Sequence, residues 1–145
     1  MDLPDVMTAI EISVPGGPEV LVPVTRPVPR PGAGELLVRV AAAGVNFIDT
    51  YKRSGVYKVQ YPFTPGSEAA GTVVGLGAGV TGFAEGDRIA TAEGADCYAG
   101  YALVDADKAL PVPDGLDDAT AAALPLQGLT AHYLVNSTFK VAAMP

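Results

Sequence analysis

The sequence predicts a mainly β domain, a barrel or folded sheet that carries helical appendages near its end. Glycine and proline supply 17 and 13 of the 145 residues, well above the roughly 12% that is usual. The apolar segments before residue 113 are short and are bounded by these turn-forming residues, as strands are. The first alanine- and leucine-rich segment typical of a helix follows residue 116. Strands first and helices last favour a β-rich core with attached helices.

The first strands are expected on either side of a tight turn. Residues 7–14 and 19–24 form extended segments, and Pro-Gly-Gly-Pro at residues 15–18 is a strong turn signal between them. A proline-rich connection that no helix would tolerate then leads to residues 35–43, the clearest strand.

One or two helical turns are expected at residues 46–53. Asn46 is a suitable cap, and Asp49 lies three residues later, near the positive end of the helix dipole. Gly55 is expected to end the helix.

The second half of the chain continues the alternation of strands and turns before the helices begin. Strands are expected at residues 69–76, 88–91, 98–104 and 108–112. Two helical segments follow at 117–124 and 126–135, separated by a break or kink at Pro125. We therefore predict a flexible tail at residues 1–6, one domain at 7–135 and a linker at 136–145.

The charge pattern limits the classes of partner that the protein is expected to bind. Nine basic and 16 acidic side chains leave a net charge of −7, with no basic cluster to neutralise phosphates. Nucleic acid and anionic membrane surfaces are therefore not expected as partners. One cysteine, no signal peptide and no apolar run of about 18 residues favour a cytoplasmic protein.

A glycine pattern at residues 77–82 imitates a dinucleotide-binding motif. Gly77, Gly79 and Gly82 have the G-x-G-x-x-G spacing, and a predicted strand precedes them. The motif requires a helix next, whose amide ends hold the pyrophosphate. Gly86 and Asp87 would break such a helix within one turn. We therefore expect a glycine-rich turn between strands.

The segment at residues 44–55 (GVNFIDTYKRSG) resembles the signature of quinone oxidoreductases, the zeta-crystallin branch of the medium-chain dehydrogenases. Further stretches agree in order and spacing, namely residues 16–21, 65–71, 86–89 and 128–133. The resemblance covers nearly the whole chain from Met7 onward.

This resemblance implies a GroES-like barrel that shapes the substrate side of the enzyme. In the family a Rossmann domain follows, whose glycine signature would come shortly after residue 145, so that domain is absent from this chain. The complete protein would pass a hydride from NADPH to a quinone. The chain alone is expected to be inactive, and the apolar surface near residues 124–135 is expected to self-associate or to meet a chain that supplies the missing domain.

Two other functions remain open. The same fold could reduce enones or acyl-thioester alkenes instead of quinones, and the barrel could be a non-catalytic binding or scaffold module. A zinc alcohol dehydrogenase is disfavoured, because zinc-dependent relatives carry a cysteine where Asn46 stands and a histidine where Ser67 precedes Glu68. One cysteine and one histidine also supply too few zinc ligands, so no metal site is expected.

The resemblance assigns candidate site residues. Asn46, Tyr51 and Tyr57 are expected to contact the reacting rings, Asn46 as both helix cap and partner of the nicotinamide. The residues expected to bind the cofactor are Asn46, Phe47, Asp49, Tyr51, Gln127, Thr130 and Tyr133. Asp49 is also expected to hold the turn, Glu68 to anchor structure, and Gln127, Thr130 and Tyr133 to share one helical face. Cys97 and His132 are expected to take no part.

Overall fold

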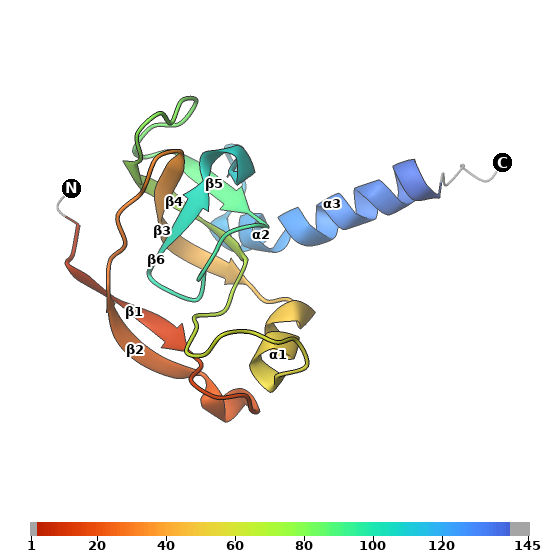
Figure 1. Cartoon of the computed structure of the whole chain (residues 1–145). Coiled ribbons are helices and arrows are strands. Elements are labelled where there is room, and N and C mark those ends of the chain that lie inside the picture. The colour runs from red at the N-terminus through yellow and green to blue at the C-terminus, as the bar shows by residue number, and fades with distance from the viewer. Residues whose placement is uncertain (1–2, 140–145) are drawn as a thin grey trace.

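The computed structural model describes residues 3–139, which form a mainly β barrel with a helical extension (Figure 1). The strands are β1 (Val6–Glu11), β2 (Val22–Pro27), β3 (Glu35–Gly44), β4 (Glu68–Leu76), β5 (Arg88–Thr91), β6 (Tyr101–Asp105) and β7 (Leu110–Pro111). The helices are α1 (Phe47–Ser54), α2 (Asp118–Ala123) and α3 (Pro125–Tyr133). Two 3₁₀ turns, η1 (Pro18–Val20) and η2 (Ala106–Lys108), and a π-helical turn, η3 (Leu134–Thr138), complete the elements.

Two antiparallel sheets build the barrel. Five strands run in the order β6-β3-β4-β5-β7, and β1 and β2 form a separate hairpin. The hairpin is tied to the segment before β6, where Ile10 N donates to Tyr98 O at 2.8 Å and Gly100 N donates to Thr8 O at 2.9 Å. Leu36, Leu37 and Val38 of β3 are all buried. Since successive side chains point to opposite faces, both faces of β3 are covered, as a barrel requires.

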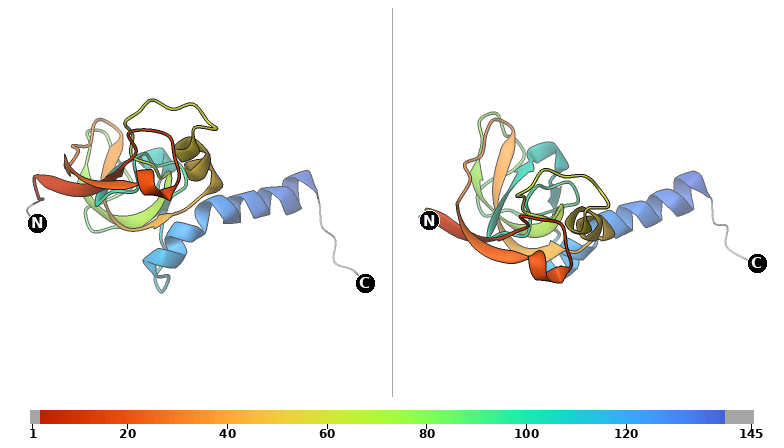
Figure 2. Two further views of the ribbon diagram at one scale, coloured as in Figure 1. Left: turned by 90° about the horizontal axis from the view of Figure 1, so that it is seen from below. Right: turned by 60° about the horizontal axis from the view of Figure 1, so that its bottom comes forward.

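The helices attach at one end of the barrel. Ala121 and Ala122 of α2 are buried against Ala70 and Ala90 of the sheet, whereas α3 leaves the barrel as a projecting rod in both views of Figure 2. Of the nine residues of α3, only Pro125 is buried. No helix in the part of the chain that the structure describes is long and apolar enough to cross a membrane.

The expected strands of the central sheet are present, but several boundaries differ. β1 ends at Glu11 rather than at residue 14, and β6 begins at Tyr101 rather than at residue 98. The segment expected to be a strand at 108–112 is extended in the sheet only at Leu110–Pro111, since η2 occupies its beginning. The extended segment expected at 19–24 begins as the 3₁₀ turn η1, because the Glu19 carboxylate accepts from Gly17 N at 2.8 Å and closes the chain locally.

The carboxyl-terminal expectations also need correction. The break expected at Pro125 is confirmed, since α2 ends at Ala123 and α3 begins at Pro125, but Pro125 itself starts the second helix, one residue earlier than expected, because proline suits the first helical position, where no amide donor is required. The helical path then continues through η3 to Thr138, so residues 136–138 are not without an element. β1 begins at Val6, within the predicted tail. Residues 1–2 of that tail and residues 140–145 of the predicted linker lie outside the described residues.

Candidate active site

Asp49 holds the turn between β3 and α1. Its Oδ2 accepts from the backbone N–H of Asn46 at 3.0 Å and from the hydroxyl of Tyr98 at 3.2 Å, and the residue is buried. Asn46 is extended, as a residue before a helix should be. Gly55 adopts the left-handed conformation that ends the helix, as expected (φ 81°). Asp49 therefore acts on the shape of the site and does not face the cleft described below.

The side chain of Asn46 lies between two partners that are distant in sequence. Its amide nitrogen donates to Glu68 Oε2 at 2.8 Å, and the amide of Gln127 donates to Asn46 Oδ1 at 3.1 Å. Asn46 is only 8% exposed. Its orientation is thus set by hydrogen bonds at both ends of the amide group.

Glu68, at the start of β4, is fully buried. Its second oxygen, Oε1, accepts from the backbone N–H of Leu126 at 2.9 Å. Gly44 makes room for this carboxylate, because a Cβ at that position would lie 2.4 Å from Glu68 Oε2 and 2.8 Å from the carbonyl oxygen of Ala122. The close approach of β3, β4 and α2 is therefore what allows Glu68 to reach Asn46.

A cleft of about 590 Å³ opens between the turn that leads into α1 and the exposed side of α3; Figure 2 shows α3 leaving the barrel near the end where α1 lies. One wall comes from the turn into α1 and the other from α3 and η3. The lining residues are Val45, Asn46, Phe47, Ile48, Leu126, Gln127, Thr130, Ala131 and Leu134. Most of these side chains are apolar, and the polar groups are concentrated at Asn46, Gln127 and Thr130.

An aromatic row continues from the cleft along α1. The rings of Phe47 and Tyr51 are stacked with centroids 6.3 Å apart, and Tyr57 meets Tyr51 edge-on at 5.5 Å. Phe47, Tyr51 and Tyr57 are 79%, 41% and 50% exposed. Tyr51 and Tyr57 do not line the cleft itself, but they extend an aromatic surface from its rim.

Tyr133 does not share the face of α3 that lines the cleft. Gln127 and Thr130 do, together with Ala131 and Leu134. A helix turns by about 100° per residue, so six residues after Gln127 the direction is off by about 120°, whereas seven residues bring it back. The expectation of one face for Gln127, Thr130 and Tyr133 is therefore wrong for Tyr133, and Leu134 takes its place.

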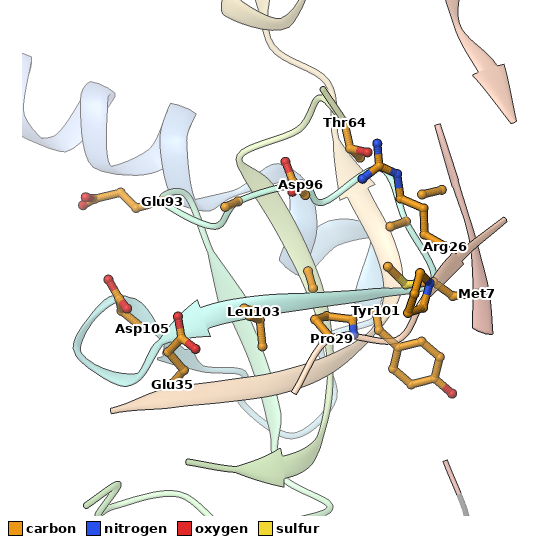
Figure 3. A pocket seen from close by; sticks show the side chains of 15 residues that line it. Met7, Arg26, Pro29, Glu35, Thr64, Glu93, Asp96, Tyr101, Leu103 and Asp105 are labelled. Atoms are coloured by element: carbon orange, nitrogen blue, oxygen red, sulfur yellow. The ribbon is translucent and has the colours of Figure 1, made fainter. Parts of the chain in front are cut away.

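A second cleft of about 500 Å³ lies between the β1–β2 hairpin and β6. Figure 3 shows Arg26 near Thr64 and Asp96 at one end, with Glu35 and Asp105 at the other. Burial raises the pKa of Asp96, and the charge of Arg26 opposes that shift. None of the residues expected to bind cofactor or substrate lines this cleft.

The raised pKa values of Cys97 and Tyr98, which lie close to Asp49, predict that the folded state loses stability at high pH. Burial, with the charges of Asp96 and Asp49 adding to it, raises the pKa of Cys97 to about 12 from its ordinary 9.0. Burial and Asp49 also raise the pKa of Tyr98. Above pH 9 the unfolded chain has lost the thiol proton that the folded chain keeps, so the free energy of unfolding falls as pH rises, by about 1.4 kcal/mol per pH unit for this one group.

Urea unfolding at pH 8 to 11 measures this slope. In Cys97→Ala the slope is expected to be smaller between pH 9 and 10, where the thiol is the main contributor, and Tyr98 is expected to add to the loss only above pH 10. Equal slopes for wild type and Cys97→Ala would contradict the burial of a neutral thiol.

The comparisons with known proteins agree with this fold and show the family of the chain. Residues 32–145 match the alcohol dehydrogenase GroES-like domain. The chain belongs to this family. The GroES-like fold implied by the sequence resemblance is thereby confirmed.

Three relatives illustrate the similarity. The chain is 42% identical over 134 residues to the quinone oxidoreductase of Pseudomonas aeruginosa, covering 91% of this chain and 41% of that protein. It is 40% identical over 143 residues to a 2-haloacrylate reductase of a Burkholderia species, covering 94% of this chain and 43% of that protein. The structure of mycobacterial Rv1454c complexed with NADPH matches with a TM-score of 0.90 at 47% identity, covering 93% of this chain and 42% of that chain. The chain thus spans about two-fifths of the length of the relatives it matches.

Proposed function

We propose that this chain forms the substrate-side wall of an NADPH-dependent quinone oxidoreductase, in which a hydride passes from the nicotinamide to a quinone without a metal. The observation that carries the proposal is the Asn46 amide, held from both ends at a mainly apolar cleft whose rim is aromatic. The nucleotide-binding half, which would cover the open side of this cleft, belongs to the part of the relatives that this chain does not span. The resemblance to quinone oxidoreductases and to an NADPH complex supports the same reading.

The polar groups of the cleft fit a nicotinamide. A carboxamide presents one acceptor and two donors, and Asn46, Gln127 and Thr130 offer amide and hydroxyl groups that can pair with it or with ribose hydroxyls. When bound, the nicotinamide supplies the hydride. The chain's part is to orient the ring, and Asn46 suits that task because Glu68 and Gln127 limit its rotation.

The aromatic row suits the flat acceptor. Phe47 offers a ring face at the cleft, and the hydroxyls of Tyr51 and Tyr57 can donate hydrogen bonds to the oxygen that gains charge during reduction. Thr130 and Gln127 border the same space from α3. Asn46, Tyr51 and Tyr57 are therefore the proposed catalytic residues, and Phe47, Gln127 and Thr130 are proposed to contact the cofactor. We propose no such contact for Asp49 or Tyr133.

The metal-free part of the proposal rests on the chemistry of the side chains. Asn46 stands where a zinc enzyme would need a thiolate, and its amide is engaged by Glu68. Cys97 is buried in the barrel core, and His132 lies exposed on α3. The two side chains that bind zinc best are therefore not at the cleft.

A second candidate acceptor is an activated alkene. The similarity to a 2-haloacrylate reductase favours it, and a hydride added to an α,β-unsaturated acid or carbonyl compound would use the same cleft. The two readings differ only in which acceptor supports NADPH oxidation.

The proposal is tested with this chain joined to the nucleotide-binding half of the Pseudomonas relative. We expect NADPH oxidation with 1,4-benzoquinone that is insensitive to a zinc chelator, and no measurable oxidation by the 145-residue chain alone. Oxidation with 2-chloroacrylate or an enone but not with the quinone would favour the alkene reading. A folded fusion that binds NADPH and transfers no hydride to any of them would point to a non-catalytic module.

A further inference from the structure

We propose that Glu68 is a positioning residue that couples the orientation of α3 to the orientation of the Asn46 amide. The importance of that amide for nicotinamide binding rests on the proposed function. The coupling itself rests on the hydrogen bonds of a fully buried carboxylate.

The first turn of α3 has an amide that its own sequence does not satisfy. Leu124, at the cap position, contributes no side-chain hydrogen bond, and Pro125 has no N–H. Helical bonding is established at Gly128, whose N–H donates to Leu124 O at 2.7 Å. The N–H of Leu126 therefore needs an external acceptor, and Glu68 Oε1 supplies one from 58 residues earlier in the chain. A carboxylate is the favoured group at this end of a helix.

The same carboxylate contacts Asn46, a residue that lines the cleft, with its other oxygen. Oε2 accepts from the Asn46 amide, and Asn46 in turn accepts from Gln127, the residue after Leu126. The three hydrogen bonds close a ring that begins and ends in the first turn of α3. Because the carboxylate is planar and both oxygens are used, a shift of α3 moves the carboxylate and with it the amide.

Gly44 restricts the carboxylate further. The backbone of β3 lies so close to Glu68 that a Cβ on Gly44 would overlap Oε2. The β3 backbone therefore limits movement of Glu68 Oε2 toward Gly44. Because α3 forms the second wall of the cleft, a movement of α3 changes the width of the cleft. Through Glu68, the same movement changes the orientation of the Asn46 side chain.

The test compares Glu68→Gln with Val73→Ala in the 145-residue chain labelled for NMR. Glutamine keeps the size but has one acceptor oxygen and one donor nitrogen, so it cannot accept from both Leu126 N–H and the Asn46 amide as they are now oriented; either one bond is lost or the Asn46 amide turns over. Val73 lies buried in the same strand, away from the cleft, and its truncation controls for a general loss of stability. Reduced nicotinamide mononucleotide is the ligand, because it carries the nicotinamide without the adenosine portion.

In Glu68→Gln we expect hydrogen exchange at the Leu126 amide at least tenfold faster after correction for global stability, and shifted resonances for the Asn46 side-chain amide. Affinity for the mononucleotide should fall at least fivefold. Val73→Ala should leave all three readouts unchanged. If Glu68→Gln does not fold, Asn46→Ala replaces it, since removing the donor at one end should alter the Leu126 amide at the other.

Two results would overturn the proposal. One is wild-type Leu126 exchange and wild-type Asn46 resonances in the glutamine variant. The other is faster Leu126 exchange with unchanged mononucleotide affinity, which would make Glu68 a helix cap and nothing more. If the wild-type 145-residue chain binds no mononucleotide, affinity is measured in the fusion that carries the nucleotide-binding half, and the Leu126 and Asn46 signals decide the coupling in either protein.

Discussion

Asn46→Ala is expected to lower kcat/KM for NADPH-dependent quinone reduction about 10- to 100-fold in the protein that carries both halves. The alanine removes a hydrogen-bonding amide from the cleft and leaves Glu68 Oε2 without its donor. A buried hydrogen bond that involves a charged group is worth about 1.5–3 kcal/mol, and 1.4 kcal/mol corresponds to a factor of ten in rate. Steady-state kinetics with varied NADPH measure the loss.

Two further variants make this result specific. Asn46→Asp keeps the shape of the side chain but places a second carboxylate next to Glu68, and we expect the repulsion between them to lower activity. Activity should recover only at low pH, where one of the two carboxylates is protonated. Tyr57→Phe, which removes one hydroxyl from the exposed end of the aromatic row, should cost less than Asn46→Ala. Wild-type kcat/KM in a folded Asn46→Ala protein would exclude the proposed role of the amide.

Local signals in the sequence were sufficient where the structure is determined locally. The turn into α1 is an example, because the cap position of Asn46, the returning bond of Asp49 and the left-handed Gly55 all lie within ten residues. The central strands were also predictable, since their apolar segments are bounded by glycine and proline. Asp49 was expected to hold the turn, and it does.

The partners of Asn46 could not be predicted in this way. Glu68 and Gln127 lie 22 and 81 residues away, and no spacing rule connects them. Only the antiparallel register of β3 with β4, which pairs Gly44 with Glu68, brings the carboxylate to Asn46. The position of Glu68, an acidic residue at the start of an apolar strand, does indicate a special role for this side chain. It does not indicate which residues the carboxylate binds.

The misleading glycine motif shows that context decides what a pattern means. β4 ends at Leu76 and β5 begins at Arg88, so no helix follows Gly82, and the turn expected from the sequence is confirmed. Gly79 and Gly82 have φ angles of 80° and 86°, in the left-handed region that glycine tolerates. The side chain of Asp87 accepts from Ala84 N at 2.8 Å, which engages an amide of the turn.

Gly77, the first glycine of that motif, is expected to be the most sensitive to substitution. A Cβ built there would lie 1.6 Å from the carbonyl oxygen of Gly32 and 3.0 Å from that of Glu35. The two segments are held backbone to backbone, because Gly77 N donates to Glu35 O at 2.8 Å and Gly34 N donates to Ala78 O at 2.9 Å. Gly77→Ala must separate them, and we expect a loss of about 3 kcal/mol in the free energy of unfolding.

Gly128→Ala is the matched control. Gly128 lies within α3, and nothing stands within 4 Å of a Cβ added there. The same chemical change should therefore stabilise the chain slightly, by about 0.5–1 kcal/mol, since alanine is the better helix former. Urea unfolding followed by circular dichroism measures both. If Gly77→Ala lies within about 0.5 kcal/mol of wild type, the close contact between the two turns does not exist in solution. A phosphate-binding role for the glycines would then need to be reconsidered, because packing would no longer explain why the first position lacks a side chain.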